Sequence, residues 1–158
     1  MTIGTNDSIP KFGTQDQVDD GTTSTIANNA FSVAADITTW TNDEDAPFAK
    51  FILECQFDTT MPTVGIIDLF GRPLDIQSTN EPGEPDANHE LTWIGAFPID
   101  FGVAADTNFF THCSVDLTEL LFQTSQTIDF YLRNNATGQT IGVDWNLWIQ
   151  PWAWGPKA

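Results

Sequence analysis

The residues of this chain that could carry out chemistry are few and scattered. There are two histidines, His89 and His112, and two cysteines, Cys55 and Cys113. Neither histidine lies in a Gly-x-Ser-x-Gly or His-Glu-x-x-His spacing, and the cysteines form no Cys-x-x-Cys pair. We therefore expect surface or structural histidines, buried free thiols, no catalytic residue, no cofactor and no transition-metal site. A Cys55–Cys113 bridge between neighbouring strands is the alternative, which a reducing cytosol disfavours.

Carboxylates are so abundant that a pair at any chosen separation is expected by chance. A single pair is therefore weak evidence for a catalytic site. The chain has 22 Asp and Glu against 5 Lys and Arg, a net charge of -17. A glycosidase needs one carboxyl with a raised pKa. Glu54, Asp129 and Asp144 instead fall on the polar phases of their strands, so the sequence does not favour a glycosidase. The oxygen-rich loops 42–45 and 81–88 could ligate calcium, but they lack the EF-hand order, and solvated surface is the simpler interpretation. The negative charge also disfavours nucleic acid and anionic membranes as partners.

The composition predicts one soluble, folded domain. The chain has 158 residues, of which 41% are hydrophobic and 12% aromatic, enough for a single core and too apolar for a disordered chain. Its first ten residues are polar and acidic, unlike a signal peptide, and no stretch approaches the roughly 18 apolar residues that span a bilayer. We therefore expect synthesis in a cytosol.

Strand-like alternation of apolar and polar residues recurs along the chain. The clearest case is 49–57, where the odd positions from Ala49 to Phe57 are apolar. Similar segments follow at 91–97, 109–117, 127–133 and 141–149, and 64–70 is a more uniformly apolar run. Such short strands with turns between them predict an all-β fold, namely a single, jelly-roll-like β-sandwich.

The remaining segments complete this expectation. Residues 1–23 are poor in apolar side chains and predict an extended N-terminal arm, which leaves 24–158 as the β-sandwich domain with an aromatic C-terminal tail. Residues 117–123 have the spacing of one helical turn. Residues 134–139 are typical of a hairpin connection between two strands. Trp93 and Trp145 lie on inward phases and are interpreted as core.

The aromatic residues near the C-terminus are the most informative feature for function. Trp148 is out of phase with its strand, and Trp152 and Trp154 follow within the last eight residues. Three interpretations stay open: a tail buried along the sandwich edge, a subunit interface, or a platform for sugar rings. Together with the pair Phe109 and Phe110, these tryptophans are the candidate interface residues.

Several segments resemble a known family. They are 26–31 (Ile-Ala-Asn-Asn-Ala-Phe), 97–101 (Phe-Pro-Ile-Asp-Phe), 128–135, the Thr-Gly-Gln turn of 137–141, and 145–148 (Trp-Asn-Leu-Trp). Over residues 24–151 the chain is similar to small β-sandwich virion proteins of tailed bacteriophages, particularly phages of marine bacteria. The resemblance implies a capsid decoration-like protein made in the host cytoplasm, and it carries over no catalytic residues.

We therefore expect a structural virion protein on the capsid exterior rather than an enzyme. Its expected partners are the major capsid protein and copies of itself, and a homotrimer is favoured by analogy with jelly-roll decoration proteins. The alternative is a carbohydrate-binding or receptor-binding module that presents its tryptophans to a surface glycan. A third interpretation, a halophilic enzyme domain, lacks a candidate titrating group.

Overall fold

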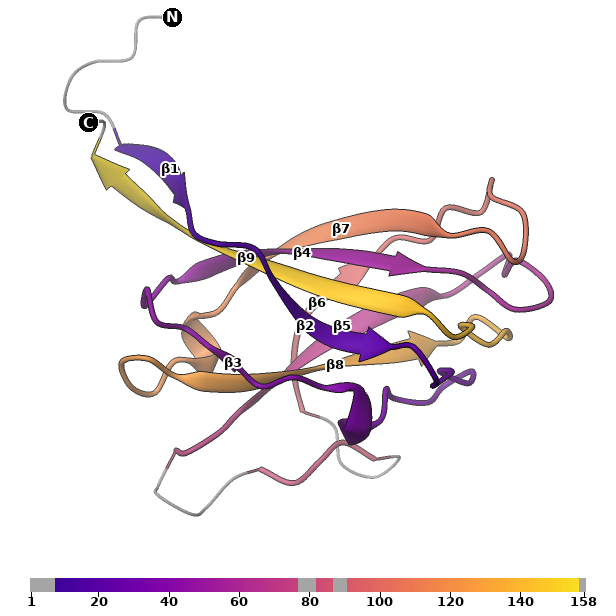
Figure 1. Cartoon of the computed structure of the whole chain (residues 1–158), viewed down its shortest axis with the longest axis horizontal. Helices are drawn as coiled ribbons and strands as arrows, with labels where there is room; N and C mark the ends of the chain where they lie inside the picture. The colour runs from indigo at the N-terminus through magenta and orange to yellow at the C-terminus, as the bar shows by residue number, and fades with distance from the viewer. Residues whose placement is uncertain (1–7, 77–81, 87–90, 157–158) are drawn as a thin grey trace, which may run out of the picture.

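The computed structural model describes residues 8–76, 82–86 and 91–156. Two antiparallel sheets pack face to face, which confirms the predicted all-β sandwich (Figure 1). The strands are β1 (Ser8–Phe12), β2 (Asp16–Gly21), β3 (Trp40–Thr41), β4 (Phe48–Cys55), β5 (Ile66–Pro73), β6 (Thr92–Phe97), β7 (Phe109–Asp116), β8 (Thr127–Asn135) and β9 (Trp145–Pro156). Two single turns of 3-10 helix, η1 (Ala34–Asp36) and η2 (Thr118–Leu120), complete the elements, and η2 lies within the predicted helical turn.

The order of the strands is that of a jelly roll. One sheet has the order β1-β9-β4-β7, with β2 also pairing with β9, and the other has the order β3-β8-β5-β6. Without β1, each of the two sheets has four strands. Most connections between successive strands cross from one sheet to the other, as in a jelly roll. The five-stranded sheet matters for function because one of its faces lies against the core and the other is turned outward.

The first described residues of the predicted arm are strands. β1 and β2 pair in turn with the same neighbour, β9: Phe12 lies opposite Trp152, and Asp16 opposite Ile149. Pro151, which lacks an N–H, lies where the edge partner of β9 changes from β2 to β1. Beyond this point β1 and the end of β9 form a two-stranded ribbon that projects from the sandwich (Figure 1).

The core lies between the two sheets and is rich in aromatic residues. In β4 the odd positions are buried and the even positions partly exposed, as the alternation predicted. The Phe51 ring meets the Phe130 ring of the opposite sheet edge to face, with centroids 4.8 Å apart. Trp145 is fully buried, and its indole Nε1 donates to the carbonyl oxygen of Ser24 at 3.0 Å.

Two expectations about individual segments are wrong. Trp93 is 57% exposed, because a register shift against β5 between Leu69 and Phe70 breaks the alternation of β6 and turns this side chain outward. The predicted hairpin at 134–139 is also absent, because β8 and β9 belong to different sheets and the connection between them crosses the edge of the sandwich. Alternation shows which face a residue takes, but not which strands pair.

The cysteines are free, and the strand register excludes a bridge between them. Cys55 lies opposite Phe109 and Cys113 opposite Phe51, so the cysteines are four positions apart along the β4–β7 ladder, about 14 Å. A disulfide requires Cα atoms within about 7 Å of each other. Cys55 is therefore a buried thiol and Cys113 a partly buried one, as the sequence predicted.

We predict that both thiols are inert in the folded protein. Burial raises the pKa of Cys113 to about 12 and that of Cys55 further still, so little reactive thiolate forms near neutral pH. Titration with an aromatic disulfide reagent at pH 8 should count no fast-reacting thiol in the native protein and two in denaturant. One thiol that reacts rapidly in the native protein would contradict this packing.

Candidate interaction surface

The outward face of the five-stranded sheet carries several large apolar side chains on either side of a polar row, Lys50, Ser114 and Gln150. Along β9 the even positions point outward, and the register places Trp148 beside Ile52 and Trp152 beside Phe48 on β4. Directly opposed residues of an antiparallel pair lie on the same face. The full set, here called the aromatic face, is Phe12, Phe48, Ile52, Phe110, Trp148, Trp152 and Trp154.

The rings of the aromatic face contact one another along the base of the ribbon. Trp152 stacks on Phe48 with a centroid separation of 4.6 Å and an interplanar angle of 25°. It also contacts Phe12 at 6.3 Å and meets Trp154 edge to face at 5.7 Å, with an interplanar angle of 78°. Trp154, Phe12 and Phe110 remain 58%, 58% and 66% exposed, so large apolar area faces solvent on this sheet.

Four of the five predicted interface residues lie on this face. Trp148 and Trp152 are partly buried there, whereas Trp154 and Phe110 are exposed. Phe109 points the other way: it is 4% exposed and stacks on Phe57 in the core with centroids 6.2 Å apart. Phe110 is therefore the member of that pair that is available for a surface contact.

The sequence analysis missed Phe12 and Phe48 as members of this surface. Phe12 lies in the segment interpreted as an arm, and its pairing with Trp152 depends on a contact between the two ends of the chain. Phe48 directly precedes the clearest alternating segment on the polar phase, which was the available signal for an outward position.

A shallow groove of about 340 Å³ lies beside the ribbon on the aromatic face. Aromatic and apolar side chains from both ends of the chain line it, namely Pro10, Phe12, Trp152 and Trp154. Lys50 and His112 also line it, from the neighbouring strands β4 and β7. We call this site the aromatic groove. It combines apolar walls with basic side chains in a protein whose net charge is -17.

The strand carboxylates do not converge on one another. Glu54, on β4, accepts a hydrogen bond from the Asn108 amide at 3.1 Å. Asp129 is buried in the other sheet, where it accepts from Thr39 Oγ1 at 2.7 Å and pairs with Arg72 Nη1 at 3.3 Å. Asp144 is exposed in the connection before β9. Arg72 and Thr39 thus give Asp129 a structural role.

The loop 42–45 is held by its own hydrogen bonds. The Asn42 side chain accepts from the backbone N–H of Ala46 and donates to its carbonyl oxygen, both at 2.9 Å, and Asp45 accepts from the Ser125 N–H at 2.8 Å. Within the described ranges no group of three or more His, Cys, Asp or Glu side chains is arranged to hold a metal. In the second loop residues 82–86 are described, and the Pro82 carbonyl oxygen accepts from Arg72 Nε at 2.7 Å. Residues 81, 87 and 88 of this loop and His89 lie outside the described residues. His112 is exposed on β7, as its polar phase predicted.

Comparisons with known proteins identify no relative of this chain. No family model, curated protein or solved structure matches this chain. Among the described residues, no helix is long and apolar enough to cross a membrane. The candidate function must therefore be argued from the aromatic face and its surroundings.

Proposed function

We propose that this chain is a structural protein of a tailed bacteriophage virion, which decorates or cements the outside of the capsid. In this proposal the aromatic face is the contact surface, the major capsid protein and copies of the chain itself are the partners, and the free assembly is a trimer. The observation that carries the proposal is the aromatic face, of which Phe12, Phe110 and Trp154 are left exposed by the described residues. Exposed apolar patches of this kind mark contact sites with other molecules.

The charge distribution supports an assembly role. Two bodies of net charge -17 repel each other, so a contact between them needs an apolar centre with acids kept at its rim. The acids that adjoin the aromatic face lie at the two ends of the β4–β7 ladder, where Glu54 is opposite Phe110 and Asp116 is opposite Phe48. An acidic surface on the outside of a shell also avoids binding the DNA that is being packaged.

The sugar-binding alternative has weaker support in the geometry. A platform for pyranose rings presents open aromatic faces to the ligand. Here one face of Trp152 is covered by Phe48, and Trp154 is turned 78° from Trp152. These two rings form a corner rather than a flat platform.

We predict that variants of the aromatic face lose binding to phage heads assembled without this chain. Trp154→Ser and Phe110→Ser should each weaken co-sedimentation with such heads about tenfold or more, because exposed aromatic anchors dominate protein interfaces. The matched controls are Trp93→Ser and Phe122→Ser, which remove side chains that are 57% and 59% exposed and lie off this face. The controls should bind like the wild type.

Two outcomes would contradict the proposal. One is a wild-type protein that does not bind the heads at all. The other is equal loss of binding in the face variants and their controls. If, in addition, a glycan array captures the wild type but not Trp154→Ser, the carbohydrate-binding alternative gains support.

A further inference from the structure

We infer that copies of this chain associate head to tail, with the Asp100–Phe101 turn of one copy seated in the aromatic groove of the next. This inference rests on the proposed assembly function and names the partner of the groove as a second copy. Three features support it: an exposed apolar knob, complementary charge, and the separation of knob and groove along the molecule.

The knob is a well-formed turn that follows β6. Phe101 is 50% exposed at this turn. The Asp100 carboxylate accepts from the Gly102 N–H at 3.0 Å, and the Asp100 carbonyl oxygen accepts from the Val103 N–H at 3.3 Å. These two hydrogen bonds fix the backbone on both sides of the ring, so seating the ring in a partner costs little conformational entropy.

The charges of knob and groove are opposite. The described residues outside the aromatic face expose six large apolar side chains: Val33, Val64, Ile66, Trp93, Phe101 and Phe122. Trp93 and Phe101 each have a carboxylate beside them. The Asp68 carboxylate beside Trp93 is buried and accepts from the Trp93 and Asn135 side chains, whereas Asp100 beside Phe101 is exposed. The groove that would receive it is lined by Lys50, and the ribbon beside it carries Lys11 and no acid.

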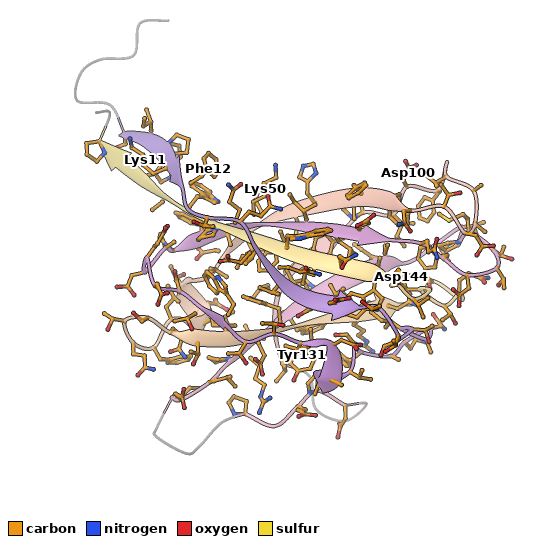
Figure 2. The ribbon with its side chains drawn as sticks, viewed as in Figure 1. Lys11, Phe12, Lys50, Asp100, Tyr131 and Asp144 are labelled. Atoms are coloured by element: carbon orange, nitrogen blue, oxygen red, sulfur yellow. The ribbon has the colours of Figure 1, made fainter. Side chains whose placement is uncertain are left out.

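Knob and groove are separate sites along the long axis of the molecule. Lys11 and Phe12 lie on the projecting ribbon, Asp100 lies toward the other end, and Lys50 lies between them (Figure 2). A contact between the two joins different surfaces of two copies. A two-fold pair would make this contact reciprocally, so the head-to-tail form rests on the proposed trimer, which requires a heterologous contact. Such contacts close into rings or continue as filaments.

In the proposed contact, side chains of the turn enter the groove, and no strand of the second copy is added at the β1 edge. β1 is an edge strand, and a free edge can pair with another chain. Pro10 lies in the middle of β1 and removes a backbone donor from that edge, as proteins commonly do to prevent such pairing. The apolar walls of the aromatic groove remain as the contact.

The test mixes two variants with complementary defects. Phe101→Ser removes the knob and keeps the groove, and Trp154→Ser removes the groove wall and keeps the knob. By sedimentation velocity of the full-length protein, the wild type should form oligomers, and each variant alone should associate about tenfold more weakly or less. An equimolar mixture should form a 1:1 dimer, because one intact knob meets one intact groove. Trp93→Ser, as a control, should behave like the wild type.

A charge exchange tests the contact directly. Lys50→Glu and Asp100→Lys should each weaken association, and the double variant should recover it, because the opposite charges then meet again in reversed order. Thermal midpoints close to that of the wild type would show that the variants are folded. The inference is overturned if Phe101→Ser associates like the wild type, if the mixture stays monomeric, if the double variant shows no recovery, or if the wild type itself is monomeric. A monomeric wild type that still binds phage heads would overturn the head-to-tail contact and the proposed trimer, and it would leave the proposed decoration of the capsid standing.

Discussion

Gly21→Ala is expected to destabilise the protein by roughly 3 kcal/mol and to lower the thermal midpoint by roughly 10 °C. Gly21 lies opposite Trp145 in the β2–β9 ladder, and the indole crosses the position that a side chain at Gly21 would occupy. A Cβ there would lie 1.9 Å from Trp145 Nε1, far inside van der Waals contact. The indole must then move, and it loses its hydrogen bond to the Ser24 carbonyl oxygen.

A double-mutant cycle separates this clash from a general backbone effect. Trp145→Phe removes the indole ring that would meet the new methyl group, so Gly21→Ala should cost less in that background than in the wild type. Denaturant unfolding of the four proteins measures the difference. Equal costs in both backgrounds would mean that the indole does not set the requirement for glycine.

Asp19→Asn is expected to stabilise the protein at neutral pH and to lose this advantage as the pH falls toward 4. Asp19 is 1% exposed, and neither carboxyl oxygen has a hydrogen-bond partner among the described residues. Burial raises the pKa of this carboxyl well above its usual value, and the nearby Asp129 and Asp36 raise it further.

The sign of the pH dependence follows from this shift. The unfolded chain releases the Asp19 proton near pH 4, whereas the folded chain keeps it to a higher pH. Between those two pKa values the unfolded state binds fewer protons, so the stability of the wild type falls by about 1.4 kcal/mol per pH unit from this group. The amide of Asn cannot ionise, so the variant escapes this loss.

Denaturant unfolding from pH 4 to pH 8 measures the effect, with Asp43→Asn as the control. Asp43 is exposed, so that variant makes the same change in net charge without changing a buried group. The gap in unfolding free energy between Asp19→Asn and the wild type should widen as the pH rises. A variant that is less stable than the wild type by a constant amount at every pH would mean that the Asp19 carboxylate is well solvated or partnered in solution.

The sequence predicted the strands better than it predicted their partners. Alternation located β4, β7 and β8 because each has one face on the core. The same pattern already placed Phe109 on the apolar phase and Phe110 on the opposite one, which is how the structure divides them. Trp93 was misassigned because a bulge is a local break in register that no periodic pattern contains.

The features that could not be predicted from the sequence depend on contacts between residues that are far apart in the chain. The last strand was expected at 141–149 but runs from Trp145 to Pro156, because β1, from the other end of the chain, supplies its final partner. Asp129 lies on the outward phase of β8 and is nevertheless buried, since the side chains of Thr39 and Arg72 approach it from other segments. The aromatic face combines residues from four strands, so its tryptophans were predictable and its phenylalanine partners Phe12 and Phe48 were not.

A reconstruction of the intact particle tests the central claim most directly. The account predicts density for a jelly-roll sandwich on the outside of the shell, with the aromatic face of the five-stranded sheet buried against the shell or a neighbouring copy. Trp154 and Phe110, which are 58% and 66% exposed in the single chain, should be covered there. Particles without this protein, or a bound protein whose aromatic face is open to solvent, would contradict the account.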